Sequence, residues 1–82
     1  MGFVTNKVSV YPNPTKAIAT VSFEQRVFTD AKLIDFKGTI LATKKIANTA
    51  TLLDFDMTML NAGNYIIQLV GEATKNLKII KE

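Results

Sequence analysis

Apolar and polar residues alternate along most of the chain. The clearest run covers residues 17–24, in which every odd position is apolar, and the same spacing returns at 53–57 and 65–69. A period of two places successive side chains on opposite sides of an extended backbone, which is typical of a β-strand with one buried face. The pattern therefore predicts strands rather than helices for most of the sequence.

Four further segments complete the predicted set. Short strands are expected at 7–11 and 31–35, a longer one at 39–46, and a last one at 75–80. Asp35 precedes a Phe-Lys-Gly turn, in which Asp35 should accept from nearby backbone donors and Gly38 suits a left-handed conformation. Residues 71–74 form another predicted hairpin turn. A helix at 27–33 is the alternative, but β-branched and aromatic residues dominate its surroundings.

About seven short antiparallel strands in so short a chain predict an all-β fold, an immunoglobulin-like β-sandwich of two sheets. One spacing supports this fold. Leu60 follows a strand, Gly63 supplies a turn and Tyr65 opens the next strand. The arrangement resembles the tyrosine corner of immunoglobulin-like domains, in which the phenol hydroxyl binds upstream backbone. Tyr65 is therefore expected to be structural.

The composition fits one small globular domain. The chain has 82 residues, of which 48% are hydrophobic and 21% charged, and no apolar run is long enough to span a bilayer. The net charge of +3 comes with scattered lysines, so no nucleic-acid-binding face is expected. The start of the chain lacks a signal-peptide pattern. We assign residues 1–7 to an added start or a residual linker, and residues 8–82 to the domain.

The residues that carry most catalytic chemistry are missing. The chain has no histidine and no cysteine, and Ser9 and Ser22 lie in predicted strands with no base nearby in the sequence. Asp54 and Asp56 share one face of a strand, which leaves a solvated face, a calcium site or an acid/base couple open. Because Phe55 faces the core, the solvated face is the simplest interpretation. We expect no enzyme activity, no cofactor and no metal.

The segment at residues 11–14, Tyr-Pro-Asn-Pro, interrupts the alternation. Each proline fixes φ, lacks a backbone donor and restricts the preceding residue, so Pro12 and Pro14 cannot donate to a sheet ladder. The segment is expected to be stiff, extended and unpaired on its donor side. The segment either ends a strand or is recognised by a partner protein, and the residues alone do not decide between these two roles.

These features stand in an order that resembles the type A C-terminal sorting domain (Por secretion system) of proteins exported by the bacterial type IX secretion system. The Tyr-Pro-Asn-Pro segment comes first, the turn at Asp35 and Gly38 follows, then the corner at Gly63 and Tyr65, and a lysine-bearing strand closes the chain. The resemblance covers nearly all of residues 8–82. It implies an immunoglobulin-like sandwich without catalytic activity.

The resemblance also implies a delivery signal. Proteins of this kind enter the periplasm with an ordinary signal peptide, and the type IX translocon recognises the last domain and passes the upstream passenger across the outer membrane. A surface sortase-like protease then removes the domain, and the passenger is anchored to lipopolysaccharide or released. The implied location is the periplasm in transit, then the outer-membrane surface or the extracellular space of a Gram-negative bacterium.

The motifs of the family fall on particular residues of this chain. The implied recognition residues are Pro12, Asn13, Pro14, Gly63, Tyr65, Lys75, Lys78 and Lys81. Asp35, Gly38 and Leu60 are implied to be turn or structural residues. Residues 57–59, Met-Thr-Met, depart from the shorter polar run that is common before the leucine.

A mechanism of recognition can be proposed from the last strand. It is expected at a sheet edge, with its lysines on one side and Leu77 and Ile79 on the other, where a receptor could add a strand. The lysines either steer the edge to an acidic receptor or only prevent self-pairing, and weak homodimerisation through the edge stays open. The Tyr-Pro-Asn-Pro segment is expected to keep the opposite region rigid.

Two other classes of protein stay open. A structural immunoglobulin- or fibronectin-like spacer, or an adhesion module of a bacterial surface protein, would have the same tyrosine corner. A calcium-dependent carbohydrate-binding module would depend on Asp54 and Asp56. The absence of tryptophan makes a sugar-stacking platform a poor fit.

Overall fold

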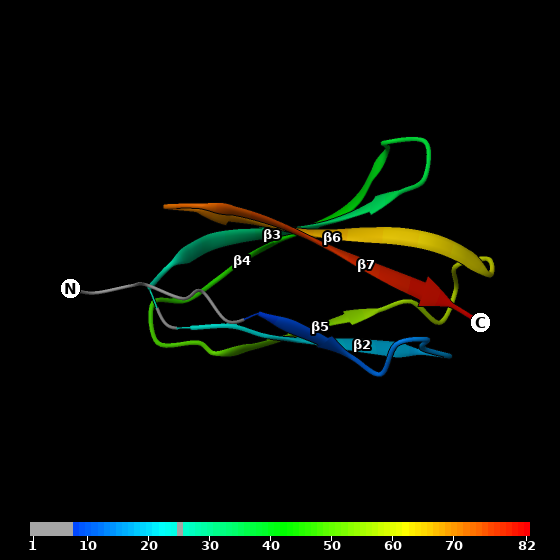
Figure 1. Cartoon of the computed structure of the whole chain (residues 1–82), viewed down its shortest axis with the longest axis horizontal. Helices are drawn as coiled ribbons and strands as arrows, with labels where there is room; N and C mark the ends of the chain where they lie inside the picture. The colour runs from blue at the N-terminus through cyan, green and yellow to red at the C-terminus, as the bar shows by residue number, and fades with distance from the viewer. Residues whose placement is uncertain (1–7, 25) are drawn as a thin grey trace.

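The chain folds as a sandwich of two antiparallel sheets in the computed structural model, which describes residues 8–24 and 26–82 (Figure 1). The strands are β1 (Ser9–Tyr11), β2 (Ile18–Ser22), β3 (Phe28–Asp35), β4 (Ile40–Lys45), β5 (Leu52–Asp56), β6 (Gly63–Gly71) and β7 (Thr74–Lys81). One sheet has the order β1-β2-β5 and the other the order β4-β3-β6-β7. The predicted all-β sandwich is confirmed.

The predicted strands are found with their ends shifted by up to three residues, and the largest shift is at the start of β3. β3 begins at Phe28 rather than at Ala31, because Phe28 is buried and meets the ring of Phe23 edge-on, with the ring centroids 6.3 Å apart. In the segment 27–33, for which a helix was the alternative, residues 28–33 therefore lie in a strand. The predicted first strand began at Lys7, which lies outside the described residues.

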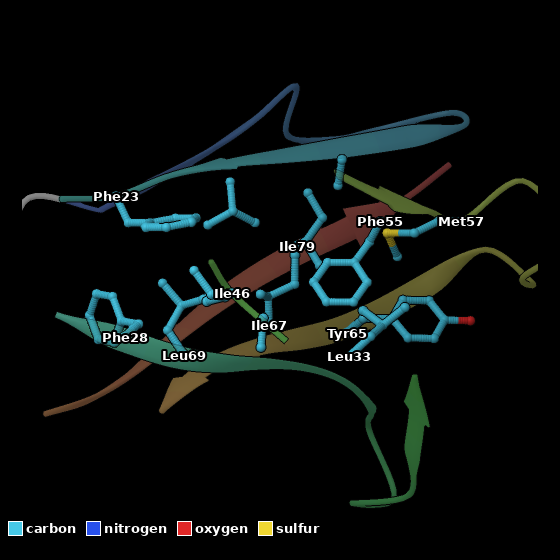
Figure 2. Close-up of a cluster of buried hydrophobic side chains, with 13 residues drawn as sticks. Phe23, Phe28, Leu33, Ile46, Phe55, Met57, Tyr65, Ile67, Leu69 and Ile79 are labelled. Carbon is cyan, nitrogen blue, oxygen red and sulfur yellow. The ribbon is translucent and has the colours of Figure 1, made fainter. Parts of the chain in front are cut away.

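The core lies between the sheets and follows the alternation of the sequence. Odd positions of β2, β5, β6 and β7 point inward (Figure 2). The buried apolar residues are Ala19, Val21, Phe23, Phe28, Ala31, Leu33, Ile46, Phe55, Met57, Tyr65, Ile67, Leu69 and Ile79. Burial of a large aliphatic or aromatic side chain stabilises a fold by about 1.5–3 kcal/mol, so this cluster supplies the main driving force for folding.

Two neighbouring strands of the four-stranded sheet come very close together at the end of β6, where Gly71 meets the start of β3. A Cβ atom on Gly71 would lie 2.3 Å from the carbonyl oxygen of Val27 and 2.6 Å from the Cα atom of Phe28. Neither atom is the flexible end of a side chain. Only glycine fits at this position without a backbone shift.

The β3–β4 hairpin bends away from the sandwich at its tip (Figure 1). The Oδ1 atom of Asp35 accepts hydrogen bonds from the backbone N–H groups of Lys37 and Thr39, both at 2.9 Å. Gly38 has φ +89°, which is a conformation that side chains with a Cβ atom disfavour. The predicted turn chemistry of Asp35 and Gly38 is confirmed.

Candidate functional site

The Tyr-Pro-Asn-Pro segment leaves β1 and lies against the outer edge of β7. The side-chain amide of Asn13 makes two hydrogen bonds to this strand: its Nδ2 donates to the carbonyl oxygen of Lys78, and its Oδ1 accepts from the N–H of Ile80, each at 3.0 Å. The peptide bonds before Pro12 and Pro14 are both cis. One side chain thus offers β7 the donor and the acceptor that a neighbouring backbone would offer.

Thr15 continues this contact with its backbone. Its N–H donates to the carbonyl oxygen of Ile80, and its carbonyl oxygen accepts from the N–H of Glu82, both at 2.8 Å. Its hydroxyl donates to the carbonyl oxygen of Ile18 at 2.9 Å and accepts from the N–H of Ala17 at 3.3 Å. With 1% of its surface exposed, Thr15 is a buried polar residue with every hydrogen-bonding group satisfied.

The expectation that the Tyr-Pro-Asn-Pro segment stiffens the region opposite the last strand is therefore wrong. Its prolines cannot donate to a ladder, so the segment does not form a strand of its own beside β7. The Asn13 amide and the Thr15 backbone pair with β7 instead. Sequence analysis missed Thr15, because a threonine two residues before a backbone donor is too common a pattern to single out.

The expected place of the last strand is confirmed, since β7 is an edge strand of the four-stranded sheet. The N–H and the C=O of Ile80 both point away from β6, and in an antiparallel ladder alternate residues share this direction. Asn13 and Thr15 bind the N–H and the C=O of Ile80, the N–H of Glu82 and the C=O of Lys78. Within residues 8–24 and 26–82, no hydrogen bond reaches the outward backbone groups of Asn76. Among the described residues, the half of the edge around Asn76 is therefore uncovered.

The three lysines of the last strand do not share a face. Lys78 is exposed on the outer face and pairs with Ile66 of β6. Lys75 and Lys81 stand at odd positions, like Leu77 and Ile79, and so lie on the same face of the strand as those two residues. The expectation that all three lysines lie on the opposite face is therefore wrong. Lys81 is 8% exposed, and its Nζ donates to the carbonyl oxygen of Glu82 at 3.1 Å.

Tyr65 forms the predicted corner. Its ring packs in the core, and its hydroxyl, which points out of the apolar cluster, donates to the carbonyl oxygen of Asn61 at 2.7 Å (Figure 2). Leu60, at the start of the same loop, is half-buried and packs against the core. The phenol therefore holds the connection from β5 to β6, as in immunoglobulin-like domains.

Most of the sequence-predicted site residues meet at one end of the four-stranded sheet. Across this end, the backbone of Tyr65 pairs with Ile79 on one side and with Asp35 on the other. Gly63 pairs with Lys81, and the Asn13 side chain covers the next strand edge. Lys75 is not part of this group: it pairs with Leu69, six positions from Lys81 and so about 20 Å along the strand.

Asp54 and Asp56 lie on the exposed face of the other sheet. Asp54 accepts a hydrogen bond from the Thr20 hydroxyl at 2.7 Å, and Asp56 accepts one from the N–H of Thr58 at 2.9 Å. Hydrogen bonds from the side chain and then the backbone of Thr58 lower the pKa of Asp56 below its ordinary value. In the described part of the chain, no three acidic, histidine or cysteine residues gather in a way that could hold a metal ion.

The chain is similar to one known family over almost its whole length. No helix in the described ranges is long and apolar enough to cross a membrane. A search of the curated proteins returns no match to the chain. A comparison with protein families matches residues 9–82 to the secretion system C-terminal sorting domain. The chain therefore belongs to the family of C-terminal sorting domains of the type IX secretion system.

Proposed function

We propose that this domain delivers an upstream passenger to the type IX translocon, which carries the passenger across the outer membrane. A surface sortase-like protease then removes the domain, and the passenger is anchored or released. Family membership supports export through the type IX system. Beyond family membership, we propose that the domain contacts the translocon directly and that the protease then cleaves it off.

The observation that carries this proposal is the convergence of the motif residues around β7. The Tyr-Pro-Asn-Pro segment, the Gly63 and Tyr65 corner and Lys78 lie side by side across one end of the sheet. Residues far apart in the sequence thus form one surface, which a receptor would meet only on the folded domain. Unfolding of the domain should therefore abolish export.

We place the translocon contact on the open half of the β7 edge. Asn13 and Thr15 cover the half near Lys81, so a receptor strand would pair with the half that runs from Thr74 to Lys78. Lys75 and Lys78 are exposed there, and they would attract acidic residues of the receptor.

A reporter fusion tests the proposal. A fluorescent protein with a signal peptide is fused upstream of the whole chain, and its amount outside the cell is measured in strains with and without a working type IX system. We expect external reporter only in the first strain. Equal amounts in both strains would refute the proposed function.

A pair of variants at one position tests the strand contact. Asn76→Pro removes an outward N–H and leaves the ladder to β6 intact, because the edge side of an edge strand tolerates proline. Asn76→Ala loses the same side chain but keeps the N–H. We expect export to fall at least about tenfold for the proline variant and to stay near wild type for the alanine variant. Equal export of both would exclude strand addition at this edge. Deletion of residues 75–82 is a poorer test, because it removes Ile79 from the core.

A further inference from the structure

The tip of the β3–β4 hairpin carries exposed apolar side chains at the same end of the molecule as the motif residues. Phe36 is 76% exposed and Met59, in the loop after β5, is 93% exposed. Large apolar side chains this exposed and this close together are uncommon on a small domain and mark interaction sites. Neither residue is among the expected recognition residues, although Phe36 lies within the turn between Asp35 and Gly38.

Two hollows flank Phe36. The larger, of about 460 Å³, lies between the hairpin and the loop before β6, and its apolar wall includes Phe36, Leu41, Met59 and Leu60. The smaller, of about 310 Å³, is lined by Phe36, Asn64, Tyr65, Ile66 and Lys78. We call these two hollows and the ring between them the Phe36 notch. The Tyr65 corner forms part of both walls.

A register shift in the hairpin accounts for the position of Leu41. Leu33 pairs with Ala42 and Ile34 pairs with Ile40, so Leu41 is left without a partner on β3. Such a bulge turns a side chain away from its usual face and is common next to functional sites. Here it brings Leu41 into the larger hollow.

The charge around the notch is positive. The Nζ atom of Lys37 lies 5.8 Å from the centre of the Phe36 ring, and Lys78 lines the smaller hollow. Asp35 also lines the larger hollow, but its Oδ1 atom already accepts two backbone hydrogen bonds within the turn. A visiting chain would therefore meet an apolar surface between two ammonium groups.

We propose that the Phe36 notch binds an extended segment of a partner protein in which bulky apolar residues alternate with carboxylates. The apolar residues would fill the hollows on each side of Phe36, and the carboxylates would pair with Lys37 and Lys78. A second copy of this chain fits less well, because two domains of net charge +3 would bring their lysines together. The inference rests on the proposed function, since it adds a second contact to the one at the β7 edge.

A peptide titration tests the preference of the Phe36 notch for apolar and acidic residues, and it needs no export assay. The probe is a seven-residue peptide with two leucines set between aspartates. One control peptide has lysines in place of the aspartates, and the other has serines in place of the leucines. Each is titrated into the isotope-labelled chain and followed through the backbone amide signals. We expect the first peptide to shift residues 35–41 and 59–66 and to bind roughly tenfold or more tightly than either control.

Variants connect this binding to export. Phe36→Ser and Met59→Ser should each weaken peptide binding roughly tenfold and lower export of the reporter fusion, with unchanged unfolding temperatures. Leu52→Ser is the matched control, because Leu52 is 55% exposed and does not line the notch. It should bind and export like wild type. If one notch variant fails to fold, the other carries the same test.

The outcomes separate this inference from the proposed function. Peptide binding that is absent, indifferent to charge, or mapped to other residues would overturn the inference, as would amide shifts at the notch that grow with the concentration of the chain alone. Normal export of both notch variants would also overturn it while leaving the proposed function intact. If the wild-type fusion does not require the type IX system, the proposed function itself fails.

Discussion

Replacement of Asn13 by alanine should destabilise the domain through two hydrogen bonds at once. The Asn13 amide joins the first motif to β7, 65 positions away at Lys78 and 67 positions away at Ile80. Each hydrogen bond contributes about 0.5–1.5 kcal/mol net. Because the side chain is exposed, water can solvate the freed groups of β7, and we expect a total loss of about 1–2 kcal/mol in the free energy of unfolding.

Thermal unfolding followed by circular dichroism measures this loss. For a domain of this size, 1 kcal/mol corresponds to about 4–8 °C in Tm, so Asn13→Ala should lower Tm by roughly 5–15 °C. Hydrogen exchange gives a local readout, because the Ile80 amide loses its acceptor and should exchange about 5–30 times faster. Asn76→Ala is the matched control: the Oδ1 atom of Asn76 accepts a hydrogen bond from the Gln68 side chain at 3.1 Å on the surface, and its loss should change stability by less than about 0.5 kcal/mol.

A Tm for Asn13→Ala within about 2 °C of wild type would refute the reasoning. It would mean that the two hydrogen bonds add nothing to the stability of the fold. A lower Tm without faster exchange at Ile80 would contradict the assignment of the effect to the β7 edge.

Three further predictions concern other parts of the sandwich. Gly71→Ala should cost at least about 2 kcal/mol in urea unfolding, because the new methyl group would lie 2.3 Å from the carbonyl oxygen of Val27; an unchanged urea midpoint would contradict this packing. Tyr65→Phe loses the bond to the carbonyl oxygen of Asn61 and should cost about 1–2 kcal/mol, and a stability equal to wild type would rule out a role for the hydroxyl. Asp56 has a lowered pKa in the folded state, so its contribution is complete at neutral pH and is lost as the pH falls below its ordinary value of 3.8. Asp56→Asn should therefore lose less stability than wild type between pH 6 and pH 3 in urea unfolding, and parallel losses would refute the linkage.

The alternation of the sequence predicts most of the fold because burial enforces it. A strand of a sandwich has one face in the core, so the odd positions at 65–69 could not have been polar without cost. The corner of Tyr65 and the turn of Asp35 were predictable for a different reason: each is satisfied by backbone a few residues away. Local patterns of this kind can be read without knowing how the strands are ordered.

The contacts of Asn13 were beyond sequence reasoning because they depend on strand order. The prolines correctly predict a segment that cannot form a full ladder, but nothing local shows which strand lies beside it. The sequence could have predicted that Lys81 lies on the same face of the strand as Ile79, because the two are separated by two positions. It could not have predicted the burial of Lys81, since a lysine at the end of a strand is ordinarily exposed. The Phe36 notch also escaped prediction, because a hairpin turn gives no sign that its tip lies near the loop before β6.

The pairing of Thr15 with Lys81 is parallel, and this direction has a mechanical consequence. A pull applied upstream of Asn13 and beyond Lys81 draws the two segments in opposite directions along their common axis. The hydrogen bonds of Asn13 and Thr15 then bear the load together in shear, whereas an antiparallel hairpin pulled at its open end breaks one bond at a time. A chain stretched between its two ends would therefore load this junction in its stronger direction.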